Sequence, residues 1–214
     1  FYTNSEGYLI TPEVLPYGEY SLVEVQAPYG YALDKTPVAF SVSSENAEKE
    51  NSLTIVKVEK QNTAQKGKIS VRKTGDIFTS VATASSAYTN ENGEMIVNPT
   101  TYTPVFADGD LSGAVFQVIA VEDIVTLDGT VRASAGDVVA EITTDENGYA
   151  ETEPLYLGKY EVREIKAPYG YVLNNEPKDV ELTYAGQEFE VRDTVNTAFE
   201  NEYQSVRISL SKVM

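Results

Sequence analysis

Alternating hydrophobic and polar residues dominate this chain and predict a β protein. β-Branched or aromatic residues fall at every second position in KISVRK (68–73), GAVFQVIAV (113–121), DVVAEITT (137–144), YEVREI (160–165) and FEVRDTV (189–195). A period of two residues is the pattern of strands that bury one face. No segment shows the longer period of an amphipathic helix, so we expect the fold to be built from strands.

Turn residues separate these segments. Asn-Glu-Asn-Gly at 90–93 and Asp-Glu-Asn-Gly at 145–148 supply the positive backbone angles that tight hairpins need, and Ala-Pro-Tyr-Gly corners at 27–30 and 167–170 end strands sharply. Short strands with regular turns predict antiparallel Greek-key β-sandwiches. The polar, small residues of 77–110 predict an inserted hairpin.

A long motif occurs twice and predicts tandem domains. GEYSLVEVQAPYGY at 18–31 matches GKYEVREIKAPYGY at 158–171, which aligns Glu24 with Glu164 and, further on, Asn62 with Asn201. Each asparagine is followed eleven residues later by a lysine, Lys73 or Lys212. This register indicates that each unit opens on a lysine strand, carries a glutamate in its middle and closes on an asparagine strand.

The register also predicts the domain boundaries. Residues 1–63 are expected to be the C-terminal part of a sandwich that lacks its own first strands, and residues 64–203 a complete sandwich with an insertion around 77–110. Residues 204–214 read as the opening strand of a following unit, because SVRISLSK resembles KISVRK. We therefore interpret the chain as an excerpt of a longer array.

The charge of the chain limits its partners. The formal net charge is −17, from 33 acidic and 16 basic side chains, which argues against binding to nucleic acid or to an anionic bilayer. No apolar run approaches the roughly 20 residues of a membrane span, so we expect no membrane insertion in this segment.

The chain has no cysteine and no histidine. Disulfides, thiolate chemistry, the usual zinc sites and histidine-dependent nucleophiles are therefore excluded. Asp108 and Asp110, and Asp145 and Asn147, lack the spacing of a complete calcium loop and read as turn residues. We expect no metal, no cofactor and no turnover enzyme.

Several motifs follow one another in a recognisable order. A lysine strand, SVRKTGD (70–76), leads to LSGAVF (111–116), then to a Thr-x-x-x-Gly turn at 144–149, to YEVREIKAPYGY (160–171) and to a closing strand, AFENEYQ (198–204). In this order they resemble the B-type repeat domains of collagen adhesins and the related prealbumin-like pilin domains of Gram-positive bacteria. The spacing between Lys73 and LSGAVF is longer than is usual for that family.

The resemblance implies an isopeptide bond between Lys73 and Asn201, with Glu164 in the catalytic glutamate position of the so-called E-box. In the first unit, Glu24 would take the same role, while Asn62 would lack a lysine partner. Lys212 would be the lysine of the following unit and would lack its partner here. Such a bond would form autocatalytically and only once in each molecule.

Alternation supports burial of these groups. Val71 and Lys73 share one strand face, and Val162 and Glu164 share another, so each ionisable residue points with an apolar one. Burial disfavours both charges, and a neutral lysine can attack the amide of Asn201 while the glutamic acid polarises it. The alternative is a surface salt bridge between Lys73 and Glu164, worth about 0–1 kcal/mol, with Asn201 capping a turn.

Two functions follow. The first is a structural stalk of an extracellular, cell-wall-anchored adhesin or pilus-like protein, whose partners are the neighbouring repeats of the same polypeptide. The alternative is an adhesin module that binds a host matrix protein or glycan, with 77–110 as the ligand face, since a fold does not determine a function.

Overall fold

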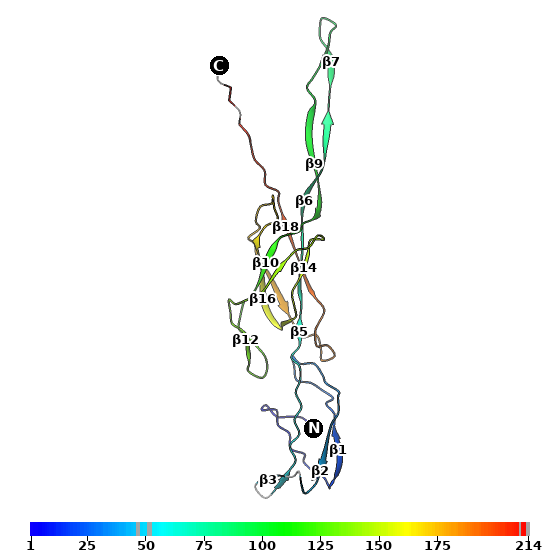
Figure 1. The fold of residues 1–214 in the computed structure, drawn as a ribbon, viewed down its shortest axis with the longest axis vertical. Helices are drawn as coiled ribbons and strands as arrows, with labels where there is room; N and C mark the ends of the chain where they lie inside the picture. Colours follow the sequence, from blue (N-terminus) through cyan, green and yellow to red (C-terminus); the bar gives the residue numbers. More distant parts are fainter. Residues whose placement is uncertain (46–47, 51–52, 210, 213–214) are drawn as a thin grey trace. The chain divides into compact units, whose positions relative to one another are not determined.

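The computed structural model describes residues 1–45, 48–50, 53–209 and 211–212, and all regular secondary structure in these residues is β (Figure 1). The prediction of an all-β fold is confirmed. No helix with the length and apolar character of a membrane span occurs in the part of the chain that the structure describes. The chain divides into two compact units, which we call unit 1 (Phe1–Ala64 with Gly186–Glu190) and unit 2 (Gln65–Ala185 with Val191–Met214).

Unit 1 consists of two antiparallel hairpins and little core. Strand β1 (Gly18–Leu22) pairs with β2 (Val38–Val42), and β3 (Glu48–Glu50) pairs with β4 (Leu53–Ile55). Among its residues whose burial is described, the buried apolar side chains are only Ala27 and Ala32.

The prediction that Asn62 lies in a strand is wrong. Residues 56–63 lie outside the strands, and the nearest pairing is an isolated bridge between Tyr31 and Ala64. A strand needs a neighbour to bond with, and in unit 2 that neighbour is the lysine strand. The described residues of unit 1 include no equivalent of this strand, so the segment around Asn62 has no ladder to join.

Unit 2 contains the remaining strands. These are β5 (Lys66–Gly67), β6 (Ile69–Ala84), β7 (Ala87–Thr89), β8 (Met95–Val97), β9 (Thr101–Asp110), β10 (Val115–Ala120), β11 (Ile124–Val125), β12 (Val131–Ala133), β13 (Val138–Thr143), β14 (Tyr149–Glu151), β15 (Leu155–Tyr156), β16 (Gly158–Lys166), β17 (Lys178–Leu182) and β18 (Val195–Asn201).

Two sheets of unit 2 pack face to face as a sandwich. One has the order β13-β10-β16-β17, and the other has the order β14-β6-β18, with β9 also paired to β6. Phe116 of the first sheet meets Phe199 of the second, with ring centroids 4.8 Å apart. Along β16, Tyr160, Val162 and Glu164 are buried while their neighbours are less so, which is the predicted period of two.

One strand pair differs from the predicted antiparallel pattern. Strand β18 runs parallel to β6, with Phe199 opposite Lys73 and Asn201 opposite Gly75. A parallel pair needs a long return connection. Here the chain returns to the start of β6, where the backbone N–H of Val195 donates to the carbonyl of Lys68 at 2.9 Å. The first and last strands of the sandwich are therefore direct neighbours.

The predicted strand FEVRDTV is also wrong, because only Val195 belongs to a strand. Residues 186–190 fall in unit 1, and Val191 makes only an isolated bridge to Lys66. The side chain of Arg192 lies over Gly67, and its guanidinium donates to the carbonyl of Thr183 at 2.7 Å. The alternation of this segment therefore reflects a return loop rather than a ladder.

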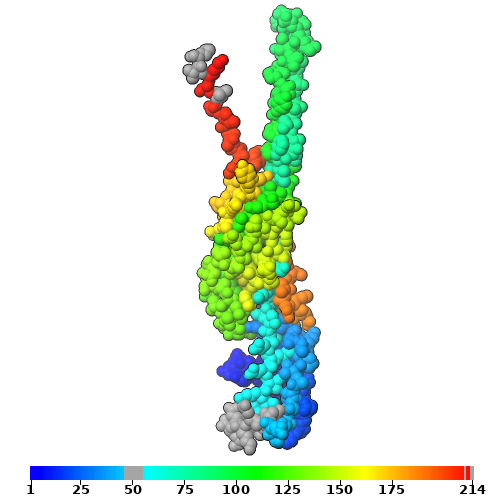
Figure 2. All heavy atoms as spheres, in the orientation of Figure 1, coloured from blue at the N-terminus to red at the C-terminus, as the bar shows by residue number. Residues whose placement is uncertain are grey.

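The segment 77–110 forms the hairpin expected for it. Strand β6 continues past the sandwich and pairs with β9, and β7 and β8 extend the pair to a turn at 90–93 (Figure 1). We call residues 77–107 the ribbon. It is a narrow two-stranded projection from the sandwich, coloured green in Figure 2.

The backbone of Lys73 is held by two of the sequence motifs. Its N–H donates to the carbonyl of Gly148 at 2.7 Å, and its carbonyl accepts from the N–H of Leu111 at 3.0 Å. The hydroxyl of Thr144 donates to the carbonyl of Leu111 at 2.9 Å and accepts from the N–H of Ala114 at 3.1 Å. The LSGAVF segment and the Thr-x-x-x-Gly turn therefore form one hydrogen-bonded unit around the lysine strand.

Gly148 is required in this unit for two reasons. Its φ is +65°, and a Cβ there would lie 2.4 Å from the carbonyl oxygen of Lys73. We expect Gly148→Ala to lower the free energy of unfolding by about 3 kcal/mol, since left-handed strain and a backbone clash add. Urea denaturation measures the loss, best in a Glu164→Ala background where no cross-link is expected to mask it.

Gly113→Ala is the matched control. Gly113 also has a positive φ, of +81°, but a Cβ there would meet nothing within 4 Å. Only the conformational cost of about 1–2 kcal/mol then applies. Equal losses for the two variants would contradict the role of close packing at Gly148.

Candidate functional site

Lys73, Glu164 and Asn201 meet in the core of unit 2. They come from β6, β16 and β18, so both sheets contribute. Their exposed fractions are 0%, 1% and 3%. The alternation that turns Val71 and Val162 inward turns Lys73 and Glu164 inward as well.

The three side chains form a closed triangle. The Nζ of Lys73 donates to Oδ1 of Asn201 at 2.6 Å, and Nδ2 of Asn201 donates to Oε1 of Glu164 at 2.9 Å. The Nζ of Lys73 also lies 3.3 Å from Oε1 of Glu164. The amine of Lys73, the carboxyl group of Glu164 and the side-chain amide of Asn201 are thus in mutual contact. In this arrangement the amine could attack the amide.

The surroundings of the amine are apolar. The ring centroids of Phe116 and Phe199 lie 5.9 Å and 5.8 Å from Nζ of Lys73. Burial lowers the pKa of Lys73, and the charge of Glu164 opposes this shift without cancelling it. The neutral, nucleophilic form of the amine is therefore more accessible than that of a lysine in water.

The alternative of a surface salt bridge is wrong. The side chains of Lys73 and Glu164 are both 0% exposed, and Asn201 lies in β18 rather than in a turn. A buried ion pair is weak evidence for stabilisation, because desolvation offsets the attraction. The arrangement therefore indicates a possible reaction among the three side chains rather than stabilisation by an ion pair.

Asn174 is a site residue that sequence reasoning missed. Its backbone N–H donates to Oε2 of Glu164 at 2.8 Å, which orients the carboxyl group toward Lys73 and Asn201. In unit 1, the N–H of Asp34 donates to Oε2 of Glu24 at 3.2 Å. The signal was available, since each of these residues follows its glutamate by ten positions in the repeat.

Unit 1 contains the corresponding glutamate and asparagine. The Nδ2 of Asn62 donates to Oε2 of Glu24 at 2.7 Å. The nearby Lys60 instead donates to Oδ2 of Asp34 at 2.8 Å and to the carbonyl of Thr36 at 2.7 Å. Lys212 lies exposed in the C-terminal segment of unit 2, so the structure does not bring it to either site.

The acidic turn residues have structural partners. Oδ1 of Asp145 accepts from the N–H groups of Asn147 and Tyr149, both at 2.9 Å, and Asp110 pairs with Arg72 at 2.8 Å. Among the described residues, no cluster of three or more potential ligands is arranged to hold a metal ion.

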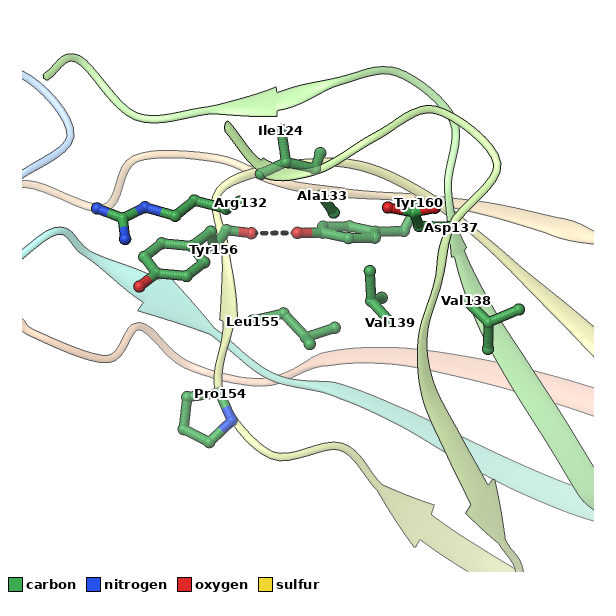
Figure 3. A pocket seen from close by; sticks show the side chains of 10 residues that line it. All are labelled: Ile124, Arg132, Ala133, Asp137, Val138, Val139, Pro154, Leu155, Tyr156 and Tyr160. Carbon is green, nitrogen blue, oxygen red and sulfur yellow. Dashed lines mark hydrogen bonds between the residues drawn. The ribbon is translucent and has the colours of Figure 1, made fainter. Parts of the chain in front are cut away.

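A shallow pocket of about 380 Å³ lies beside β11 and β12 (Figure 3). The hydroxyl of Tyr160 donates to the carbonyl of Tyr156 at 2.6 Å, and burial raises the pKa of Tyr160 to about 12. Arg132 donates to Thr126 and Asp128. These polar groups are hydrogen-bonded within the protein, and we assign no ligand to the pocket.

Comparison with known proteins identifies related domains. A family model described as SpaA, prealbumin-like fold domain, matches residues 1–57 and 106–197. The trypsin-resistant surface T6 protein of Streptococcus pyogenes serotype M6 is 38% identical over 50 residues, which is 23% of this chain and 9% of that protein.

Two solved structures match most of this chain. The Bacillus anthracis TIE protein matches 88% of this chain and 26% of its own, with a TM-score of 0.51 and 24% identity. GBS52, the minor pilin of Streptococcus agalactiae, matches 88% of this chain and 66% of its own, with a TM-score of 0.38 and 16% identity. The chain thus spans about a tenth of the T6 protein and about a quarter of the TIE chain. With the family model covering most of its length, this chain belongs to the SpaA prealbumin-like fold domain family.

Proposed function

We propose that this chain is a structural stalk segment of a Gram-positive surface protein of the adhesin or pilus type, stiffened by an isopeptide bond between Lys73 and Asn201. The observation that carries the proposal is the 2.6 Å contact of Nζ with Oδ1 inside a buried site that also holds Glu164. The T6 relative is described as a surface protein, which supports the extracellular location in this proposal.

The reaction begins with a proton transfer. Burial in this apolar site disfavours both charged groups, so a proton of the Lys73 ammonium passes to Glu164, whose Oε1 lies 3.3 Å from Nζ. The neutral Nζ then attacks Cγ of Asn201 while the carboxylic acid polarises the amide. Glu164 relays a proton to Nδ2, the Cγ–Nδ2 bond breaks, and ammonia leaves.

The stoichiometry of the reaction means that each molecule can form the bond only once. One ammonium and one carboxamide become a secondary amide and an ammonium ion, and Glu164 regains its initial state. Asn201 is consumed, so the protein is not an enzyme in the usual sense.

The mechanical consequence follows from the parallel pairing of β6 with β18. A pull on the two ends of unit 2 would pass along β6 to Lys73, cross to Asn201 and leave the domain. The chain between these two residues, which lie 128 positions apart, would carry no tension. On the chain-entropy model, closing a loop of this size also stabilises the fold by about 5 kcal/mol.

A tandem array is the context we propose for this bond, with residues 1–63, 64–203 and 204–214 in successive units. Matching contacts in the two copies support it. The hydroxyl of Tyr20 donates to the carbonyl four residues before it at 2.8 Å, as that of Tyr160 does at 2.6 Å. The Asn62–Glu24 hydrogen bond likewise matches that of Asn201 with Glu164. The partners of each unit are then its neighbours in the same polypeptide.

Loss of ammonia tests the cross-link directly. The intact mass of the denatured chain should be lower by one ammonia, and Glu164→Ala should restore the full mass in a folded protein. The control is Glu161→Ala, which removes a carboxylate from the other face of β16, where it pairs with Arg163 at 2.6 Å. The full mass in folded wild-type protein would contradict the cross-link. Ammonia loss in Glu164→Ala would show that Glu164 is not the catalytic residue.

The buried amine predicts a pH dependence. In Glu164→Ala the opposing charge is gone, so folded Lys73 should lose its proton well below the ordinary pKa of 10.5, whereas the unfolded chain keeps it. The unfolded state then binds more protons, so the free energy of unfolding should rise with pH, by at most about 1.4 kcal/mol per unit. Urea denaturation from about pH 7 to about pH 10 measures this slope.

The matched control for that slope is the double variant Lys73→Met/Glu164→Ala. It lacks the buried amine and should show only the background slope of the other groups. Identical slopes in the two proteins would mean that Lys73 keeps an ordinary pKa in the fold.

Unit 1 should remain uncross-linked in this chain. Its Glu24–Asn62 pair forms without a lysine strand, so peptide mapping by mass spectrometry should recover Asn62 as a free asparagine. A bond from Asn62 to any lysine between residues 1 and 63 would contradict the proposed boundaries. Restoring the preceding strand of the natural protein should release a second ammonia.

A further inference from the structure

The ribbon is unusually poor in charge for an exposed element. Between Ile77 and Ala107 the chain carries two charged side chains, Glu91 and Glu94, and both lie at the tip. Exposed edges are normally guarded by charged residues, and a two-stranded ribbon alone is only marginally stable in water. A neutral ribbon of this kind is suited to being covered.

One face of the ribbon carries more of its large apolar side chains than the other. Tyr102, Pro104 and Phe106 alternate along β9, so they share a face, and Val81 of β6 lies opposite Pro104. We call these four residues the apolar ribbon face. Tyr102 is 68% exposed and Val81 is 49% exposed. The opposite face carries the smaller pair Ala82 and Thr103, with Val105 two residues further along β9.

The ribbon points in the direction in which the chain leaves unit 2. Strand β18 runs parallel to β6 and ends with Asn201 opposite Gly75, the point where β6 leaves the sandwich. The residues after Asn201 and the ribbon therefore emerge from the same end (Figure 1). The segment directly after β18 therefore begins beside the base of the ribbon.

The segment after β18 already contacts the ribbon at its base. The ring of Tyr203 stacks on Phe106, with centroids 4.4 Å apart and an interplanar angle of 4°. The phenolic hydroxyl of Tyr171 donates to the carbonyl of Asp76 at 2.8 Å. The first residues beyond β18 thus lie on the apolar ribbon face.

We propose that the ribbon is a strap whose apolar face docks on the next prealbumin-like unit of the same polypeptide, the unit that Ser205–Lys212 opens. This inference rests on the tandem organisation proposed above. From Asp76 to Glu91 the ribbon reaches about 50 Å at the usual rise per residue, enough to lie along the strands of another sandwich.

Charge and tethering favour this occupant. A following unit as acidic as this chain, whose net charge is −17, would repel an acidic ribbon but not a neutral one. Because the two are joined by a short connection, their effective concentration is high, and a modest apolar contact is sufficient. Neither a second copy of the chain nor a host ligand has this advantage.

Hydrogen exchange tests the proposal in the natural polypeptide continued through the following unit. The ribbon amides of Ile77–Ala84 should exchange at least about tenfold more slowly there than in the 214-residue chain. Val81→Glu with Tyr102→Glu should abolish the difference. Ala82→Glu with Thr103→Glu adds the same charge to the other face and should preserve it.

Three results would overturn the strap. They are equal exchange in the two polypeptides, a concentration-dependent dimer of the 214-residue chain that protects the same amides, and ribbon-dependent binding of that chain to immobilised matrix proteins. Intact mass separates this failure from failure of the proposed function. Ammonia loss from unit 2 and from the following unit, with unprotected ribbon amides, would retain the cross-linked array and reject the strap alone.

Discussion

The burial of one amine is the constraint on which the rest of unit 2 depends. A primary amine in an apolar core is expensive unless its neighbours are placed to contact it, and Glu164 and Asn201 are those neighbours. They come from different strands, so β18 must pair with β6 in register and β16 must face β6 from the other sheet. Even the carboxyl group needs the backbone N–H of Asn174 to fix its orientation.

Burial of the amine also explains the positions of Gly148 and Thr144. The carbonyl and N–H of Lys73 are bonded to Leu111 and Gly148, and Thr144 ties the segments that carry them. A motif that reads in the sequence as a turn signal is thus also the support of the lysine strand.

Local periodicity was sufficient to predict which faces are buried, because a strand places alternate side chains on one face whatever its neighbours are. It predicted that Lys73 and Glu164 point inward with Val71 and Val162, and the repeat pointed to Asn201 as well. The pairing of the strands was harder to predict from the sequence. The direction of β18 depends on where a return loop brings the chain, and Phe189–Thr194 has strand-like alternation in a segment without a continuous partner. Asn62 shows the same limit, since it lacks a neighbouring strand. Asn174 acts through its backbone, and only the spacing within the repeat signals that contact.

The origin of the three groups gives the site a further property, which concerns the order of folding. Lys73 belongs to the first long strand of unit 2 and Asn201 to the last, and Glu164 reaches them from the opposite sheet. On a chain that emerges from its amino end, the amine must wait until every strand of the sandwich has appeared and both sheets have closed. A covalent bond at this position would therefore be a permanent record that folding was completed, and a truncated or misregistered unit would never carry it.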